Sequence, residues 1–315
     1  MSFENIVGHE EIKKQLLNSL NMGTLAHAHI FCGEDGIGKS IISKELSINI
    51  IGQSEINRDY VDIIEYKLNK GKQSIGIAEV LSIITEINKK PYEGDKKVVI
   101  IYNSDRMTTE AQNAFLKTIE EPPKGVYIIF LSESLDSILD TIKSRCQIHE
   151  LRRLKKEELT KFINDNLIGI DSDKKEDICA FSDGIPGRIK RFLEDEDFEA
   201  LRNTALDVII DSRKKNKEDM LKYEDFFVKN KTSWKENLVC VLYYVRDIII
   251  YKETSEEQFI INRDKIIMIK ELANIFSFSQ LSGIIEIIND TAKNLERNVN
   301  AALAIDSMLL NIQEV

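Results

Sequence analysis

Apolar residues in the first 150 positions follow two alternating patterns. Segments with apolar residues three and four positions apart predict helices, whereas short continuous apolar runs predict buried strands. The predicted helices span residues 10–20, 41–51, 77–87 and 111–119, and the predicted strands span 28–32, 60–66, 97–102 and 126–131. Strands separated by helices are typical of a parallel sheet covered on both faces, so this part is predicted to be an α/β domain.

Beyond Glu150 only the helical pattern continues. The predicted helices span 155–166 and 171–182, one opens at Pro186-Gly187, and the rest span 201–214, 234–252, 263–276, 279–295 and 299–312. Proline is tolerated in the first turn of a helix, which fits the third of these. We therefore expect three parts: an α/β domain over residues 1–150, a small three-helix domain over 151–198 and a larger all-helical domain over 199–315.

Composition and charge exclude several classes of protein. The chain has 43 Lys and Arg against 53 Asp and Glu, and this net charge of −10 argues against a surface coated for nonspecific nucleic-acid binding. A local basic patch stays compatible with it. The four cysteines lie far apart without a CxxC pair, so neither a disulfide framework nor a zinc site is predicted. Apolar runs are too short to span a bilayer and the start lacks a signal core, so we expect a cytoplasmic protein.

One glycine-rich segment fits the phosphate-binding pattern G-x-x-x-x-G-K-[ST]. It consists of Gly33, Glu34, Asp35, Gly36, Ile37, Gly38, Lys39 and Ser40. It follows a predicted buried strand and begins a predicted helix, as a P-loop requires. Backbone N–H groups and the helix N-terminus would hold a polyphosphate, Lys39 would reach its β and γ phosphates, and Ser40 would hold Mg²⁺. The alternative is an ordinary glycine turn that caps a helix.

The acid that a hydrolysing P-loop needs is missing from its expected place. Such an acid, usually an aspartate, ends a buried strand and holds the metal through water. The predicted strand 97–102 ends in Tyr102 and Asn103, and Asp105 lies in the following turn. The pattern therefore indicates nucleotide binding with little or no hydrolysis. Two alternatives stay open: a self-sufficient ATPase that uses an unrecognised acid such as Asp105, and a scaffold with an empty P-loop.

Two arginines are further candidates for phosphate contacts. Arg145 lies between Ser144 and Cys146, after the last apolar strand of the α/β domain. Spacing alone favours a surface or salt-bridging arginine, and the sharper interpretation is a guanidinium presented to a neighbour's phosphate. Arg188 follows a Gly-Ile-Pro-Gly turn at the start of a helix, a pattern that by itself indicates only a turn.

Several segments together resemble the AAA+ clamp-loader family. They are residues 3–9, 25–31 and 97–123, the Ser144-Arg145-Cys146 motif, and residues 298–310. The resemblance implies an AAA+ P-loop NTPase domain with a parallel sheet, a small helical lid and a C-terminal helical collar that holds a hetero-oligomeric ring together. The chain also departs from the family pattern at several positions. Hydrolysing subunits carry Asp-Glu where this chain has Tyr102-Asn103, and Ser132-Glu133 replaces the usual sensor 1 residue. Residues 51–59 lack the four-cysteine zinc module of many relatives, so no zinc is expected.

The same resemblance implies a role in DNA replication. It points to a non-motor subunit of the DNA polymerase III clamp loader that helps load the sliding clamp onto primed DNA, without hydrolysing ATP by itself; DNA-directed DNA polymerase activity would belong to the holoenzyme. The implied partners are gamma/tau ATPase subunits and a delta subunit, with indirect links to the sliding clamp and primer-template DNA and none to a membrane. A gamma/tau-like motor subunit is the alternative.

The resemblance also assigns roles to residues. Arg145 would act in trans on the ATP of an adjacent subunit, which makes that interpretation the favoured one. The P-loop would hold ATP or ADP, with Mg²⁺ at Ser40. Arg188 stands where the sensor 2 arginine of the lid is expected.

Overall fold

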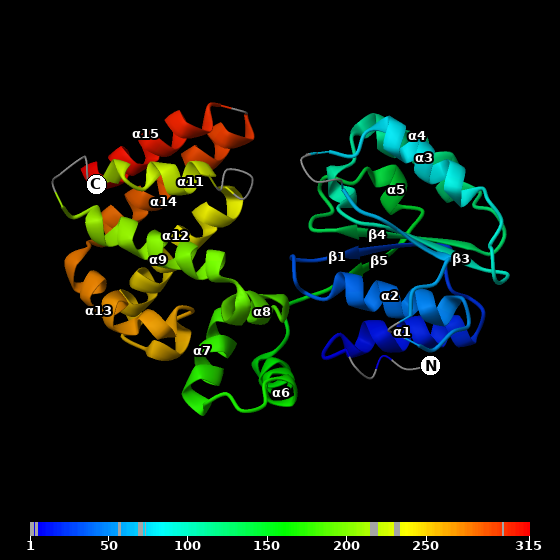
Figure 1. Ribbon diagram of the computed structural model, residues 1–315, viewed down its shortest axis with the longest axis horizontal. Coiled ribbons are helices and arrows are strands. Elements are labelled where there is room, and N and C mark those ends of the chain that lie inside the picture. Colours follow the sequence, from blue (N-terminus) through cyan, green and yellow to red (C-terminus); the bar gives the residue numbers. More distant parts are fainter. Residues whose placement is uncertain are drawn as a thin grey trace. The chain divides into compact units, whose positions relative to one another are not determined.

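The chain forms two compact units (Figure 1). The computed structural model describes residues 3, 6–55, 58–68, 72, 74–214, 220–229, 234–297 and 299–315. The first unit comprises Met1–Asp165 and Gly184–Gly187, and the second comprises Asn166–Asp183 and Arg188–Val315. The three-part division at residues 150 and 198 stays a prediction. Of the segments that resemble clamp loaders, Glu4, Asn5 and Asn298 lie outside the described residues.

The first unit is built around a five-stranded parallel sheet. Its strands are β1 (Ala28–Cys32), β2 (Ile63–Tyr66), β3 (Lys97–Ile101), β4 (Val126–Ser132) and β5 (Gln147–Glu150), in the order β2-β3-β4-β1-β5. Strand β1, next to the central strand β4, pairs with β4 on one side and with β5 on the other, with Ile30 opposite Phe130 and Ile148. Because β1, β3 and β4 are covered on both faces, their residues form continuous apolar runs instead of alternating with polar ones. The predicted α/β class with a parallel sheet is confirmed.

Helices cover the two faces of this sheet, as Figure 1 shows. On one face lie α1 (Glu10–Asn21) and α2 (Lys39–Ile50), which pack Leu16 and Leu46 against Phe31 of β1. On the other face lie α3 (Ile77–Ile87), α4 (Thr109–Glu120) and α5 (Asp140–Lys143), which pack Val80 and Phe115 against Ile30. The 3-10 turn η1 (Ser104–Arg106) follows β3, and α6 (Lys156–Asn166) follows β5. Alternate residues of β1 thus belong to opposite cores.

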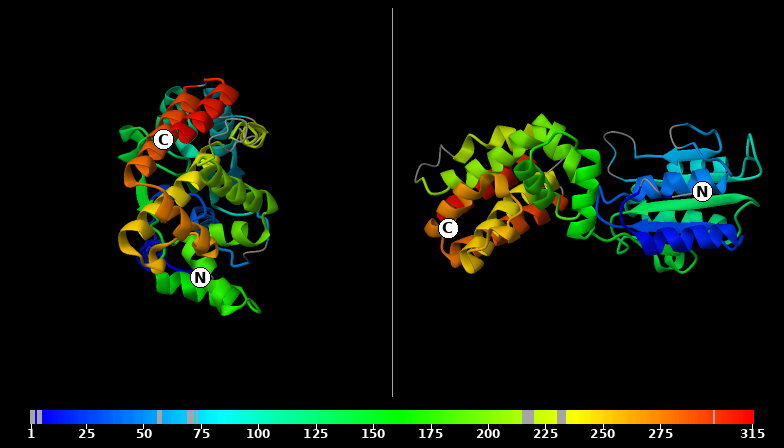
Figure 2. Two further views of the ribbon diagram at one scale, coloured as in Figure 1. Left: turned by 90° about the vertical axis from the view of Figure 1, so that its left-hand side faces the viewer. Right: turned by 90° about the horizontal axis from the view of Figure 1, so that it is seen from below.

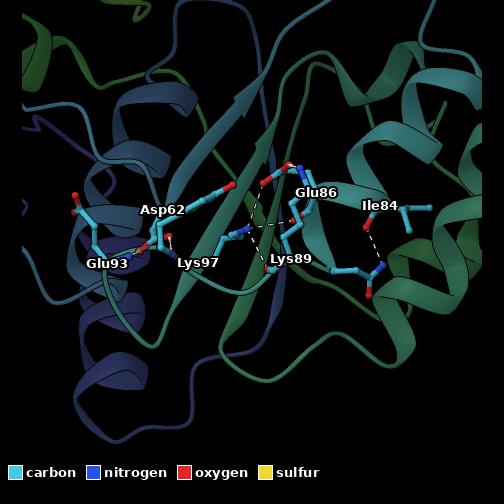
Figure 3. A network of polar contacts seen from close by, with 8 residues as sticks. Asp62, Ile84, Glu86, Lys89, Glu93 and Lys97 are labelled. Carbon is cyan, nitrogen blue, oxygen red and sulfur yellow. Dashed lines mark hydrogen bonds and ion pairs between the residues drawn. The ribbon is translucent and has the colours of Figure 1, made fainter.

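A buried lysine and a buried aspartate fix the segment between α3 and β3 (Figure 3). The ammonium of Lys97 is fully buried and donates to the carbonyl oxygens of Glu86 and Lys89, at 3.2 and 3.1 Å, so it satisfies carbonyls at the end of α3. The carboxylate of Asp62 accepts hydrogen bonds from the backbone N–H groups of Tyr92, Glu93 and Gly94. These contacts hold the N-terminal end of β3, whose other end leads to Tyr102.

The second unit is all-helical (Figure 2). Its helices are α7 (Ser172–Ser182), α8 (Gly187–Glu194), α9 (Glu196–Asp211), α11 (Glu224–Lys229), α12 (Trp234–Thr254), α13 (Ile266–Ile275), α14 (Phe278–Glu296) and α15 (Ala301–Glu314), with 3-10 turns η3 (Glu257–Phe259) and η4 (Arg263–Lys265). Residues from α7 to α15 share one apolar core. The predicted C-terminal helical domain is confirmed.

One buried arginine connects the first helices of this unit to the rest. The guanidinium carbon of Arg202, on α9, lies 4.7 Å from the ring centroids of both Phe181 on α7 and Phe192 on α8. The same guanidinium donates to Asp264 at 2.7 Å and to Asn262 at 3.0 Å. A buried cation needs such partners, and these bind four segments together. This explains why α7 and α8 belong to the same compact unit as the larger helical domain.

Three short elements were not predicted from the sequence. β5 has only four residues, with the polar Gln147, His149 and Glu150 among them, so it lacks the apolar run of the other strands. α5 also has four residues and α11 has six, lengths at which helical periodicity is not visible.

No helix in the described ranges combines the length and apolar character needed to cross a membrane. Within that same part of the chain, no group of three or more His, Cys, Asp and Glu side chains is arranged to hold a metal ion.

Two buried histidines face each other across β1 and β5. His29 Nδ1 lies 3.1 Å from His149 Nε2, and His29 Nε2 lies 2.9 Å from the carbonyl oxygen of Ala26. Since that carbonyl can only accept, His29 donates from Nε2 and accepts at Nδ1 from the N–H of His149. Burial lowers the pKa of His29 to about 3 and that of His149 to about 4, so both are neutral in the folded chain.

This pair predicts a loss of stability in mild acid. The unfolded chain binds more protons than the folded chain below the ordinary histidine pKa of 6.5, so stability falls as the pH drops from there toward the lowered values. We expect protonation of the two histidines in the unfolded chain to lower the free energy of unfolding by about 2 kcal/mol between pH 7 and pH 5.5. Urea unfolding at the two pH values measures this change. His149→Gln should reduce this loss by about half, and His27→Gln is the control that leaves the pair intact. An equal pH dependence in His149→Gln and wild type would contradict the assignment.

Candidate functional site

The glycine-rich segment forms a loop between strand β1 and helix α2. Gly36 and Gly38 have φ angles of 79° and 111°, a region that favours glycine, and Gly38 occupies the N-cap of α2. Ile37 between them is buried in the core under the sheet, which anchors the loop. Ser40 is exposed in the first turn of α2. The loop therefore has the strand–loop–helix setting in which backbone N–H groups and a helix N-terminus can bind phosphate.

The ammonium of Lys39 folds back onto this loop. It donates to the carbonyl oxygens of Gly33 at 2.6 Å and Glu34 at 2.9 Å. Burial lowers the pKa of Lys39, and the nearby carboxylates, first of all Asp35, act in the opposite direction. The ammonium predicted to contact phosphates thus lies against the first two residues of the loop.

A second segment of the first unit packs directly against the loop. The Gly187 N–H donates to the Gly36 carbonyl at 2.9 Å, and a Cβ on Gly187 would come within 2.5 Å of the Gly36 Cα. Farther back, Leu154 N–H donates to the Gly184 carbonyl at 2.8 Å, and Ile185 is fully buried in the core beneath the loop. The turn over 184–187, which the sequence alone did not connect with the P-loop, therefore braces it.

The sequence reasoning also missed a basic partner of the loop, Arg153. Its guanidinium forms a two-pronged ion pair with the Glu34 carboxylate, with Nε to Oε1 at 2.5 Å and Nη2 to Oε2 at 2.8 Å. These residues are 119 positions apart in the chain. Arg153 lies three residues after β5, and since β5 itself was not predicted, nothing in the sequence placed this arginine beside the loop.

Tyr102 lies where the carboxylate of a hydrolysing site is expected, directly after β3. Its hydroxyl donates to Glu65 Oε2 at 3.0 Å, and Lys67 forms an ion pair with the same carboxylate at 2.8 Å. Burial, together with the charge of Glu65, raises the pKa of Tyr102, so the phenol stays protonated. Asn103 adopts a left-handed backbone with φ 51°. Neither side chain supplies an acid.

Two further polar residues lie near the ends of strands β3 and β4: Asp105, in the turn after β3, and Ser132, the last residue of β4. Asp105 Oδ1 accepts a hydrogen bond from the backbone N–H of Glu133 at 3.2 Å. The charges of Asp105 and Glu133 oppose the lowering of the Lys39 pKa by burial, which places negative charge near the P-loop. Ser132, at the sensor 1 position, is buried and bonds the Ser134 carbonyl at 2.5 Å.

Arg145 is held at the surface of the first unit, just after α5. Its Nη2 lies 2.7 Å from Glu120 Oε1 at the end of α4, and its Nη1 donates to the Thr141 carbonyl at 2.9 Å. About two fifths of the Arg145 side chain is exposed (38%) and nearly half of that of Glu120 (47%). The salt-bridging interpretation therefore describes its contacts within the chain, and its exposure leaves it open to an external group.

Arg188 belongs to the second unit, whereas the P-loop belongs to the first. It is the second residue of α8, and its guanidinium carbon lies 5.4 Å from the centroid of the Tyr243 ring on α12. The proposed role of Arg188 at nucleotide stays a prediction.

Comparisons with known proteins agree along most of the chain. Residues 8–155 match a family model described as DNA polymerase III, delta subunit, and residues 196–314 match its C-terminal counterpart. The delta' subunit of DNA polymerase III from Bacillus subtilis is 25% identical over 323 aligned positions, which cover 96% of this chain and 95% of that protein.

Other relatives match in part. The gamma subunit of DNA polymerase III from Buchnera aphidicola (Acyrthosiphon pisum) is 30% identical over 189 residues, which cover 55% of this chain and 52% of that protein. The chain thus spans about half the length of that relative. Among solved structures, a gamma subunit-related protein from Thermotoga maritima is 16% identical, with a TM-score of 0.48 over 95% of this chain and 99% of that one.

The close packing of Gly187 against the loop predicts that Gly187→Ala destabilises the first unit. The added Cβ would lie 2.5 Å from a backbone atom that cannot move without displacing the P-loop. We expect a loss of about 1–3 kcal/mol in the free energy of unfolding, measured by urea unfolding without nucleotide. Gly94→Ala is the control, since its nearest neighbouring atom lies at 4.0 Å. Equal stability of the two variants would refute the bracing role.

Proposed function

The chain belongs to the family of DNA polymerase III clamp-loader delta-prime subunits, and on that basis we propose that it is a non-motor subunit of the loader. In this role it assembles with gamma/tau ATPase subunits and a delta subunit. It helps the complex load the sliding clamp onto primed DNA without hydrolysing ATP itself.

The observation that carries the non-motor role is the pairing of an intact P-loop with Tyr102. A phenol cannot hold a metal through water as a carboxylate does, and its proton is engaged by Glu65. The loop keeps its glycines, Lys39 and Ser40, which suit ATP or ADP with Mg²⁺. Nucleotide would then be held as a structural ligand.

In this proposal the Arg145 guanidinium contacts the phosphates of ATP bound to a neighbouring subunit. Its present partner, Glu120, is an exposed carboxylate, and exposed ion pairs contribute only about 0–1 kcal/mol. A phosphate group offers the guanidinium the same kind of charge-assisted hydrogen bonds, so exchanging the exposed Glu120 for phosphate would cost little. Arg145 stabilises transition-state charge there, while the residues of its own P-loop have a separate role.

A self-sufficient ATPase is the second candidate, and one observation favours it. Asp105 is oriented by the Glu133 backbone, and its charge acts on Lys39. Purified chain that hydrolyses ATP at about one turnover per second or faster, and loses this activity in Asp105→Asn, would support it over the non-motor role.

Arg145→Ala should impair the assembled loader. An arginine supplied in trans raises phosphoryl-transfer rates by several powers of ten in other NTPases, so the ATPase site facing Arg145 should slow at least tenfold. The measurement is DNA-stimulated ATP hydrolysis and clamp loading by the reconstituted complex. Arg106→Ala, which removes another exposed arginine of the same unit, is the control. Hydrolysis at the wild-type rate in a fully assembled Arg145→Ala complex would rule out the trans-acting role.

Lys39→Ala should act on nucleotide binding instead of turnover. Titration calorimetry with ATP and Mg²⁺ should show binding to the wild-type chain and at least tenfold weaker binding to this variant. The reconstituted complex should lose less activity than with Arg145→Ala. The control is Lys44→Ala on the same helix, whose partner Asp59 lies at 3.9 Å. A wild-type chain that releases no heat with ATP would favour a scaffold with an empty P-loop, and loss of all loading in Lys39→Ala would contradict this division of roles.

A further inference from the structure

The P-loop of this chain carries an unfavourable charge for a polyphosphate site. Glu34 and Asp35 lie within the loop itself, so two carboxylates stand against the single ammonium of Lys39. Negative charges at short range repel phosphate, although exposure of both side chains to water weakens the repulsion. Neutralising part of this negative charge would therefore favour nucleotide binding.

Arg153 neutralises one of the two carboxylates. Both oxygens of Glu34 are engaged by the planar guanidinium, at 2.5 and 2.8 Å, which is the two-pronged geometry that distinguishes arginine from lysine. With this pair formed, the charge beside the phosphate site falls by one negative unit. The ion pair also holds the Glu34 carboxylate against Arg153.

The pair also acts on the backbone that positions Lys39. The Glu34 carbonyl accepts a hydrogen bond from the Lys39 ammonium at 2.9 Å, so fixing the Glu34 side chain restrains a residue that orients the lysine. Arg153 is itself restrained, because Gly184 packs so closely that a Cβ there would lie 2.7 Å from the Arg153 Cβ. The chain from Gly184 through Arg153 to Glu34 is therefore a continuous support for the first half of the loop.

We propose that Arg153 is a positioning residue for nucleotide: it cancels the charge of Glu34 and holds the P-loop in its phosphate-binding form. This role rests on the proposed nucleotide-binding function of the P-loop. It explains how a loop with two acids stays compatible with ATP or ADP. It also assigns a cis-acting basic group that the motif alone does not contain.

The test is a charge-rescue series with ATP and Mg²⁺ as the probe, measured by titration calorimetry on the full chain. Arg153→Ala should bind about tenfold more weakly than wild type, because the Glu34 carboxylate loses the guanidinium that offsets its charge. Glu34→Gln should bind at least as well as wild type. The double variant Arg153→Ala/Glu34→Gln should recover to within about threefold of wild type, since the repelling charge is gone. Arg152→Ala, the exposed neighbouring arginine, is the control.

Each outcome separates one explanation from another. Wild-type affinity in Arg153→Ala overturns the positioning role and leaves the proposed function standing. A loss that persists in the double variant overturns charge cancellation and indicates that Arg153 acts by restraining the loop or by contacting the phosphates directly. Urea unfolding of Arg153→Ala without nucleotide identifies a loss caused by unfolding alone, which Glu34→Gln would not rescue. Absence of binding to wild type overturns the nucleotide-binding proposal and this role together.

Discussion

The pairing of β1 with β4 on one side and β5 on the other is the constraint on which the site depends. Because all five strands are parallel, the segments that follow them emerge at one edge of the sheet, where ligands of such folds bind. The P-loop follows β1, Tyr102 follows β3, Ser132 ends β4 and Arg153 comes shortly after β5. A register that placed β5 elsewhere would remove the arginine from Glu34 while leaving the P-loop motif unchanged.

The polar groups at this edge divide nucleotide binding from hydrolysis. In the proposed function, the loop glycines, Lys39 and the helix N-terminus serve binding, and the ion pair of Glu34 with Arg153 limits the negative charge beside them. The position that would serve hydrolysis holds a phenol bonded to Glu65. Arg145 faces solvent from a separate place at the end of α5, held by an exposed carboxylate. In the proposed function, the same unit would bind one nucleotide and act on another.

Sequence and structure agree best where the information is local. The helical and strand periodicities located the long elements, and the P-loop, the absent acid at Tyr102 and the arginine of the Ser144-Arg145-Cys146 motif are all visible within a few residues. Short elements such as β5 were missed because four residues with mixed polarity carry no clear period. Without β5, the position of Arg153 could not be derived.

The sequence by itself determined the α/β and helical parts and the residues of the P-loop motif, because periodicity and motif spacing depend on neighbours along the chain. Tertiary structure alone decided which distant residues complete that loop. Arg153 meets Glu34 across 119 positions, Gly187 meets Gly36, and His29 meets His149 across 120. Such contacts follow from strand order and close backbone packing, and composition or local pattern cannot encode a partner that only the folded sheet brings within reach.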